Sequence, residues 1–435
     1  MKIVLISPKS PLYRYKGGIK KSLRYQPLTL TTLAALVPDD LNVELELIDE
    51  SIATIPENLE ADIIGMTVIT GTARRSYDLA QAFRARGQFV VLGGPHITLM
   101  PEEAQQYADV IFIGYAEKTW PQFLYDFVEG RHQHVYRQAS DFDLSQPVFP
   151  RRELLNNRAF LTHAVFEATR SCVHKCEFCV VPVAWGGRQY RKPIDFVIED
   201  IRRVGKKKIL FVDLNLVAYK SYAKELFERL IPLDVEWFGL STVLIANDDA
   251  MLELMARSGC KGLLLGLESV SAESLKSVNK QFNASVDYRQ LVDKLHRLHI
   301  SVQGCFVFGM DTDTVEIFDE TIDFVLEAGI DLPRFSIMTP FPGTPLFDRL
   351  EREGRILTTN WELYDVQHVV FEPKHMSPEE LSYGHRRVWR EVYRYGAIYH
   401  RLKRAGNFQP LAITSNLGYR YYGKHLEAFD RKEMG

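Results

Sequence analysis

The feature that most constrains the fold is a repeated alternation of short apolar, β-branched runs with longer amphipathic stretches. In the first 130 residues the runs are almost continuously apolar, as expected for parallel strands buried on both faces. The stretches between them have helical spacing, and Tyr77, Ala80 and Phe83 form one apolar face. This pattern predicts a doubly wound sheet, which binds ligands at the carboxyl ends of its strands. The expected strands are 2–8, 43–50, 61–69, 88–94 and 109–116, and the expected helices are 28–37, 73–87, 101–107 and 119–130.

After a polar, irregular stretch the alternation resumes, and six further strand–helix units predict an incomplete (β/α)6 barrel of the TIM type. The last part of the chain is helical and aromatic. The fold class is therefore α/β, with a Rossmann-like domain, a partial barrel and a helical tail. The expected barrel strands lie near 164–170, 208–213, 235–243, 262–268, 302–309 and 333–339. The expected divisions are a Rossmann-like domain at 1–135, a linker at 136–160, the barrel at 161–350 and the helical region at 351–435.

Composition excludes several classes of protein. A chain of 435 residues with 46% hydrophobic and 25% charged residues is too long for a small binding module and too apolar for general disorder. A net charge of -3 gives no overall field that would attract nucleic acid, so no nucleic-acid partner is expected. The apolar start ends at Pro8, too early for a signal peptide or a membrane span, so we expect the cytoplasm.

Three of the five cysteines, Cys172, Cys176 and Cys179, fall within eight residues directly after the first expected barrel strand. Thiolates are suitable ligands for iron–sulfur clusters or zinc. Three thiolates on one loop can hold three corners of a 4Fe-4S cluster and leave one iron open. Cys260 and Cys305 lie on later strand segments, where we expect small buried side chains.

A zinc site is the alternative, with His174 as the fourth ligand. The crowded spacing argues against it, because structural zinc sites draw their ligands from two separated pairs. A non-catalytic metal-binding protein that uses its first domain as a ligand sensor is the corresponding alternative function.

The spacing of the cysteines, with the aromatic Phe178 before the last one, resembles the radical S-adenosylmethionine (radical SAM) superfamily. The resemblance implies a 4Fe-4S cluster whose open iron binds S-adenosylmethionine and a reductive cleavage that releases a 5'-deoxyadenosyl radical. Two candidate residues at the ends of expected barrel strands, Asp213 and Glu268, are acidic, and each taken singly could equally be a helix cap or an ion-pair partner. By the resemblance, the candidate contacts to S-adenosylmethionine are Phe178, Asp213, Asn215, Glu268, Ser269, Gly304 and Gly309.

The first domain lacks the G-x-G-x-x-G turn of nicotinamide-binding folds, and its strands instead end in other glycine turns. A doubly wound domain before a radical SAM barrel resembles the cobalamin-dependent radical SAM enzymes, called class B when they are methyltransferases. The D-x-H-x-x-G motif that supplies histidine to cobalt is absent, as in many members of that class. The implied cobalamin contacts are Thr70, Gly71, Gly93, Gly94, His96, Gly114 and Glu117.

The resemblance implies methylation of an unactivated carbon in a small-molecule or lipid-like substrate, with an electron donor such as flavodoxin or ferredoxin. A radical oxidative cyclase or rearrangement enzyme is the alternative within the same architecture. Methylthiotransferases are disfavoured because no cysteine precedes Cys172. Near the carboxyl terminus, residues 385–404 combine arginines with Trp389 and Tyr393. Such a helix could contact a membrane peripherally, or it could be a solvated face whose aromatic side chains pack on the barrel.

Overall fold

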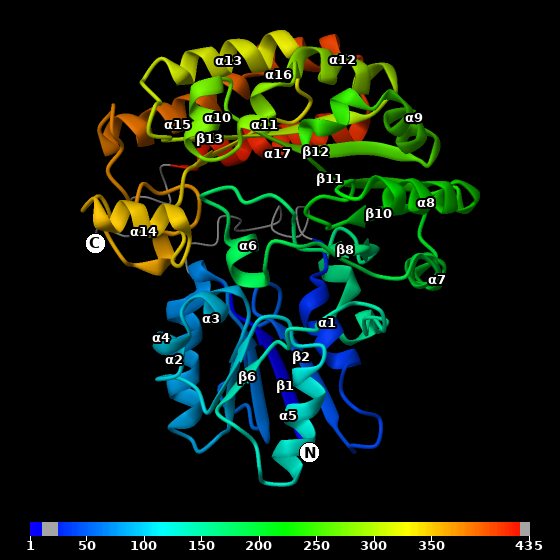
Figure 1. Ribbon diagram of the computed structural model, residues 1–435, viewed down its shortest axis with the longest axis vertical. Coiled ribbons are helices and arrows are strands. Elements are labelled where there is room, and N and C mark those ends of the chain that lie inside the picture. Colours follow the sequence, from blue (N-terminus) through cyan, green and yellow to red (C-terminus); the bar gives the residue numbers. More distant parts are fainter. Residues whose placement is uncertain (11–24, 427–435) are drawn as a thin grey trace.

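The computed structural model describes residues 1–10 and 25–426. Two six-stranded parallel sheets organise this part of the chain. Figure 1 shows the first sheet and its helices below, the second sheet with its helices above, and α6 between them. The predicted α/β fold class, with a doubly wound domain, a partial barrel and a helical tail, is confirmed.

The first sheet has the strand order β2-β1-β3-β4-β5-β6. Val4 and Ile6 of β1 pack in the core under α2, whereas Ile3 and Leu5 pack in the core under α1 and α5. Both faces of the sheet are therefore buried, which explains the nearly continuous apolar runs. The strands are β1 Lys2–Ser7, β2 Glu44–Asp49, β3 Ile63–Thr67, β4 Val90–Gly93, β5 Val110–Ile113 and β6 Val135–Arg137. The helices are α1 Leu28–Ala35, α2 Ala73–Arg84, α3 Pro95–Leu99, α4 Pro101–Ala104 and α5 Thr119–Val128.

The second sheet is an open barrel with the strand order β14-β13-β12-β11-β10-β7. Along β13, alternate residues are fully buried under the helices, and the residues between them face the inside of the barrel. The strands are β7 Val165–Phe166, β10 Lys208–Phe211, β11 Glu236–Ser241, β12 Cys260–Glu268, β13 Ser301–Phe308 and β14 Arg334–Ile337. The helices are α7 Ile194–Val204, α8 Lys220–Leu230, α9 Asp249–Arg257, α10 Ala272–Ser277, α11 Gln281–Ala284, α12 Tyr288–Arg297 and α13 Ile317–Ala328.

Two features of the domain junction were not predicted. The strand β6 adds a sixth member to the first sheet, and β8 (Thr169–Arg170) pairs with β9 (Tyr190–Arg191) in a short antiparallel ribbon. With α6 (Val180–Trp185), this ribbon brackets the cysteine loop. The two sheets lie on either side of residues 138–164, and the domain boundaries given above remain predictions.

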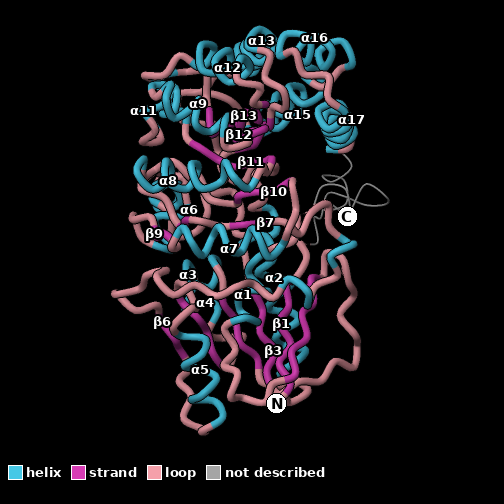
Figure 2. The backbone as a smooth tube through the Cα atoms, turned by 90° about the vertical axis from the view of Figure 1, so that its right-hand side faces the viewer, coloured by secondary structure: helices cyan, strands magenta, loops and turns pink. Residues whose placement is uncertain are grey.

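Of the carboxyl-terminal helices, α15 packs against the last barrel strand, β14, whereas α16 packs against α13 and α17 packs against α15. Trp389 donates a hydrogen bond to the Phe335 carbonyl at 3.1 Å, and both it and Tyr393 are 1% exposed. The Ile337 amide donates to the Val366 carbonyl at 2.8 Å, so the segment after α14 covers the outer edge of β14. These elements are α14 Pro345–Arg352, α15 Pro378–Val392, α16 Tyr395–Ala405 and α17 Pro410–Lys424 (Figure 2).

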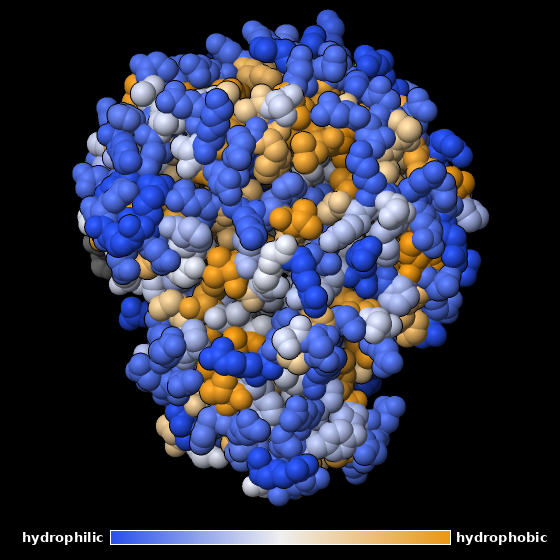
Figure 3. Space-filling model, viewed as in Figure 1, coloured by the Kyte–Doolittle hydropathy of each residue, from blue (hydrophilic) through white to orange (hydrophobic). Residues whose placement is uncertain are grey.

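The sequence 385–404 thus forms parts of two helices, α15 and α16, and its aromatic residues Trp389 and Tyr393 belong to the barrel core. None of the helices in the described ranges is long and apolar enough to cross a membrane. In Figure 3 hydrophilic side chains cover most of the front face, and apolar ones gather near its middle, where the domains meet.

Candidate active site at the domain junction

The cysteine loop connects β8 to α6, the helix that lies between the two sheets in Figure 1. Cys172, Cys176 and Cys179 are all half-buried. Burial raises the pKa of Cys176 to about 11, the other two thiols raise it further, and nearby Lys280 opposes this rise. The three thiols are therefore close enough to act on one another electrostatically. No group of three or more His, Cys, Asp or Glu side chains within residues 1–10 and 25–426 is arranged to hold a metal ion.

The turn between α10 and α11 holds this loop from the barrel side. The backbone amide of Glu177 donates to the Val278 carbonyl at 3.1 Å, and the side-chain amide nitrogen of Asn279 donates to the Lys175 carbonyl at 2.8 Å. The His174 ring stacks on Phe282 with ring centroids 4.3 Å apart. His174 therefore contributes to holding the loop, which is a role other than the zinc ligand of the alternative hypothesis.

Glu268 stands at the end of β12, where the backbone has a positive φ of 65°. Its carboxylate forms an ion pair with the ammonium group of Lys280, and both side chains are about nine-tenths buried. Gly266 makes room for this pair, because a Cβ there would lie 2.5 Å from a Glu268 carboxylate oxygen. The next residue, Ser269, is buried, and its hydroxyl accepts a hydrogen bond from the Ser271 amide at 3.1 Å.

Asp213 follows β10 and fixes the strand that leads into the cysteine loop. Its carboxylate accepts hydrogen bonds from the Ala168 amide at 3.1 Å and from the Thr169 hydroxyl at 2.7 Å. Burial raises the pKa of Asp213 to about 7, although the hydrogen bond from Thr169 lowers it. Asp213 therefore has a structural role here, and its predicted contact with S-adenosylmethionine remains a prediction.

Asn215, which follows β10, carries a buried acceptor atom. Its side chain is 1% exposed, and its amide oxygen has no hydrogen-bond partner in the described part of the chain. Gln189 reaches the same place, since its side-chain nitrogen donates to the Asn215 carbonyl at 2.6 Å while its own side-chain oxygen lacks a partner among the described residues. Buried acceptors of this kind need a donor. The ammonium group of S-adenosylmethionine is such a donor, so these residues fit the cosubstrate.

The two glycines predicted to face adenine have packing roles. A Cβ on Gly304 would lie 3.0 Å from Leu267 and 3.2 Å from Ile330. Gly309 has a φ of 98°, and a Cβ there would lie 2.9 Å from Leu381. Phe178 packs against the edge of the barrel core. The contacts of these three residues with S-adenosylmethionine remain predictions.

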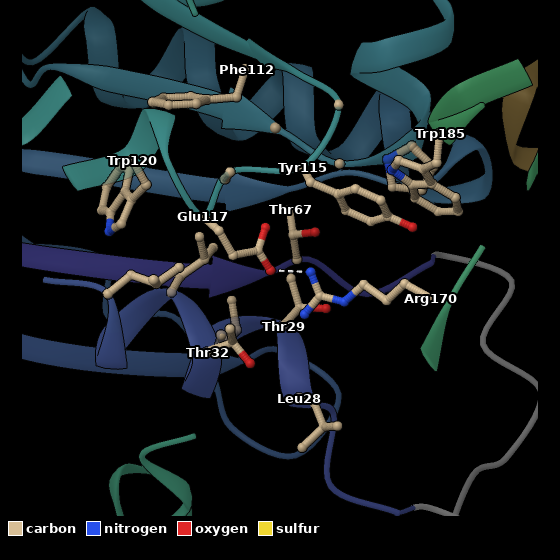
Figure 4. Close-up of a pocket in the computed structure, with 18 of the residues that line it drawn as sticks. Leu28, Thr29, Thr32, Thr67, Phe112, Tyr115, Glu117, Trp120, Arg170 and Trp185 are labelled. Carbon is tan, nitrogen blue, oxygen red and sulfur yellow. Dashed lines mark hydrogen bonds and ion pairs between the residues drawn. The ribbon is translucent and has the colours of Figure 1, made fainter. Parts of the chain in front are cut away.

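A cavity of about 420 Å³ lies where the two domains meet. Figure 4 shows Arg170 reaching from the barrel to Glu117 of the first domain, with Tyr115 and Trp185 beside each other in the wall. Apolar side chains line most of the cavity. The first domain supplies, among others, Leu5, Leu33, Leu36, Gly65, Thr67, Gly93, Gly94, Gly114, Tyr115, Glu117 and Trp120, and the barrel supplies Glu167, Thr169, Arg170, Ser171, Trp185, Val212 and Leu214.

Glycines shape the floor of this cavity. Gly94 has a φ of 107°, and a Cβ there would lie 2.7 Å from the Val68 carbonyl. Gly114 has a φ of 85°, and a Cβ there would lie 2.7 Å from Gln138. Only glycine meets both requirements, because a Cβ at either position would collide with a neighbouring segment of the same domain. Both glycine turns also line the cavity, where they form a cradle without side chains. This cradle fits cobalamin.

Of the residues predicted to contact cobalamin, Gly93, Gly94, Gly114 and Glu117 line the cavity. Thr70 and Gly71 instead form the short turn η2 (Thr70–Thr72) that precedes α2. His96 is fully buried in α3, with its ring nitrogens 3.3 Å from Thr70 Oγ1 and 3.3 Å from Glu103. These three are absent from the cavity lining in the described part of the chain, and their cobalamin contacts remain predictions.

A buried ionic network crossing the junction was missed at the sequence level. Arg170 pairs with Glu117 of the first domain and with Glu167 at 2.7 Å, and Lys192 pairs with Glu167 at 3.0 Å. Arg170 also lies over the Tyr115 ring, 5.1 Å from its centroid. The signal available in the sequence was a pair of charged residues, Glu167 and Arg170, inside an otherwise buried strand segment, because buried charges need partners.

Comparison with known proteins agrees with this architecture. A family profile described as "B12 binding domain" matches residues 22–124, one described as "Radical SAM superfamily" matches 166–325, and one for a domain of unknown function matches 344–431. The bacteriochlorophyllide d C-12(1)-methyltransferase of Chlorobaculum tepidum is 31% identical over 414 residues, covering 92% of this chain and 89% of the relative. The chain belongs to the radical SAM methyltransferases with a B12-binding domain.

Two further comparisons bear on this radical SAM methyltransferase. The bacteriochlorophyllide d C-8(2)-methyltransferase of the same organism is 30% identical over 427 residues, covering 93% of each chain. The structure of the radical SAM methyltransferase TsrM from Kitasatospora setae, with cobalamin and a [4Fe-4S] cluster bound, superposes with a TM-score of 0.66 at 15% identity and 100% coverage of both chains. At that identity the superposition shows a shared fold.

The radical SAM methyltransferase uses a 4Fe-4S cluster, S-adenosylmethionine and cobalamin. When bound, these groups supply hydrogen-atom abstraction and transfer of a methyl group to an unactivated carbon. The three cysteine thiols would hold the cluster, the buried amide oxygen of Asn215 would take the cosubstrate ammonium, and the glycine cradle would take the corrin. Tyr115 and Trp185, stacked with centroids 5.4 Å apart, form part of the cavity wall.

Proposed function

We propose that this enzyme methylates an unactivated carbon of a flat, largely apolar small molecule of the tetrapyrrole class. The observation that carries the proposal is the continuous cavity from the glycine turns of the first domain to Thr169–Ser171, which precede Cys172. Its aromatic and aliphatic walls suit a flat apolar ligand beside a cofactor. The substrate class is further supported by the two relatives whose names state that they methylate bacteriochlorophyllide d.

The test is an anaerobic reaction of the holoenzyme with S-adenosylmethionine carrying a deuterated methyl group and with bacteriochlorophyllide d. Mass spectrometry should find the deuterated methyl group in the pigment. The matched control is Cys176→Ala, which should neither cleave S-adenosylmethionine nor label the pigment. Wild-type enzyme that cleaves S-adenosylmethionine but leaves the tetrapyrrole both unlabelled and chemically unchanged would refute the substrate class. A changed but unlabelled pigment would favour the cyclase or rearrangement function.

Residue roles form part of the same proposal. We propose Cys172, Cys176 and Cys179 as the cluster ligands, and Asn215 and Glu268 as the principal contacts to S-adenosylmethionine. The cysteines are grouped on one half-buried loop. Asn215 follows β10 and Glu268 ends β12, two barrel strands that are separated by β11. Iron and sulfide analysis of each Cys→Ser variant tests the ligand set, because loss of any one ligand should leave the cluster incomplete and labile.

We propose that a one-electron donor protein of the flavodoxin or ferredoxin class reduces the cluster. Support comes from the partial exposure of all three cysteines, since electron transfer requires a donor to approach the cluster closely. Stopped-flow measurement of cluster reduction with each donor tests this. Failure of both donor classes to reduce a cluster that dithionite does reduce would refute it.

We propose that the outer face of α16 and α17 contacts an anionic membrane surface. Tyr395 and Tyr399 are 66% and 59% exposed, in contrast to the buried Trp389 and Tyr393. Residues 395–424 contain no acidic residue, and Lys403, Arg404, Arg420 and Lys424 give the two helices a positive charge that complements anionic lipids, whereas Arg401 is buried. The enzyme should sediment with phosphatidylglycerol vesicles and not with phosphatidylcholine vesicles, and a double Tyr→Ser variant at 395 and 399 should bind less. Equal binding to both vesicle types would contradict the proposal.

A further inference from the structure

Lys280 is a buried cation in the turn that joins α10 to α11. It is 7% exposed, unlike Lys276 one turn earlier, which is exposed. Burying an ammonium group is costly unless other charges compensate it. The position of Lys280 therefore requires an explanation in the charges around it.

The turn that carries Lys280 is attached to the cysteine loop on both sides of Cys176. The hydrogen bonds from Glu177 to Val278 and from Asn279 to Lys175 span it, at 3.1 and 2.8 Å. Asn279 has a φ of 57°, a left-handed conformation that lets the turn reverse between these two contacts. Lys280 follows directly, so the turn presents its ammonium group beside the loop.

The ammonium group of Lys280 also reaches into the barrel. It forms the ion pair with Glu268, and a Cβ placed on Gly266 would lie 3.0 Å from its nitrogen. Lys280 thus binds the carboxylate at the end of β12 and stands in the turn that is hydrogen-bonded to the cysteine loop on both sides of Cys176.

We propose that Lys280 is a positioning residue that holds Glu268 at the mouth of the barrel and raises the reduction potential of the cluster through its fixed positive charge. Reduction adds one negative charge to the cluster, and a nearby buried cation stabilises the reduced form more than the oxidised form. This inference rests on the assignment of the three cysteines as cluster ligands. It is independent of the identity of the methyl acceptor.

The test is a potentiometric titration of the holoenzyme cluster, followed by electron paramagnetic resonance, in wild type and Lys280→Gln. The variant should keep its iron and sulfide content, but its ratio of reduced to oxidised cluster at a given ambient potential should fall about tenfold, which is 59 mV for one electron. Lys280→Arg should restore the wild-type potential, because it keeps the charge. Lys276→Gln is the matched control and should leave the potential unchanged.

Glu268→Gln provides a second variant with the opposite expected sign. Removing the carboxylate leaves the charge of Lys280 uncompensated, so the potential should rise. An unchanged reduction potential in Lys280→Gln with an intact cluster would overturn the proposal. If Lys280→Gln does not load a cluster, a lower reduction potential in Glu268→Gln than in the wild type would overturn it. These measurements need no methyl acceptor, so failure of the proposed tetrapyrrole substrate would leave them standing.

Discussion

The ion pair between Glu117 and Arg170 joins the cobalamin-binding domain to the strand that leads into the cysteine loop. The two side chains are 16% and 14% exposed, and Glu117 has only this partner among the ion pairs within the described ranges. Arg170→Gln would leave Glu117 buried without a counter-charge, whereas Glu167 would keep Lys192 at 3.0 Å. Removing one partner of a buried pair costs about 3 to 5 kcal/mol, so we expect the free energy of unfolding to fall by roughly 3 kcal/mol.

A double-mutant cycle separates the pair from its surroundings. Glu117→Gln leaves Arg170 paired with Glu167, so its cost should be smaller, about 1 to 2 kcal/mol. The double variant should cost less than the sum, with a coupling energy of about 2 kcal/mol between directly contacting residues. Hydrogen exchange measured by mass spectrometry, on peptides that contain residues 114–118 and 167–171, reports opening of this junction.

The exposed pair of Lys118 and Asp141, 3.2 Å apart and close to the same junction, is the matched control. Its side chains are 47% and 76% exposed, so its coupling energy should be about 0.5 kcal/mol or less. If the coupling of Glu117 with Arg170 is no larger than that of the control, the reasoning from burial is wrong.

Three further predictions concern single residues of the junction. Burial raises the pKa of Asp213 to about 7, so the folded protein keeps a proton that the unfolded chain releases near pH 4. The free energy of unfolding of the wild type should therefore fall as the pH rises from about 4 to 7. In denaturant titrations at several pH values, Asp213→Asn should remove that slope. Gly94→Ala should lower the free energy of unfolding by about 1 to 3 kcal/mol and abolish retention of cobalamin through gel filtration. The control Gly130→Ala, also at a positive φ but with nothing within 4 Å, should keep cobalamin. Retention of cobalamin by Gly94→Ala would count against the cradle. His96→Gln should retain cobalamin with an unchanged cob(II)alamin resonance spectrum, since the ring is held by Thr70 and Glu103, and a changed axial signature would show that His96 reaches cobalt.

Most strands and long helices could be predicted from the sequence because burial on two faces leaves an unmistakable apolar run, as in Ile3–Ile6. The strand β6 could not, since it is three residues long and includes a charged arginine. The β8–β9 ribbon has two residues in each strand and no periodicity to detect. Its pairing depends on the tertiary position of the cysteine loop.

The candidate site divides in the same way. The cysteine loop could be singled out from the sequence because its three cysteines are close together in the chain, and their role as cluster ligands stays a prediction. Lys280 and Arg170 could not, because their partners Glu268 and Glu117 come from other elements and only the fold brings them together. His96 follows the Gly93–Gly94 turn in sequence, which is why a cobalamin contact is predicted for it. Helix α3 turns its side chain into the packed interior, and the contact stays a prediction.

An open barrel exposes the outermost strand on each side, and here the segment after α14 and the helix α15 cover β14 through the Ile337–Val366 and Trp389–Phe335 hydrogen bonds. A bare strand edge is a template onto which a second molecule can add its own strand. A protein shortened to end near residue 350 would lose this cover together with the aromatic residues that hold it. We therefore expect the carboxyl-terminal region to prevent self-association through the edge of β14. Shortened forms should form insoluble aggregates during expression, even though every cysteine of the loop is still present.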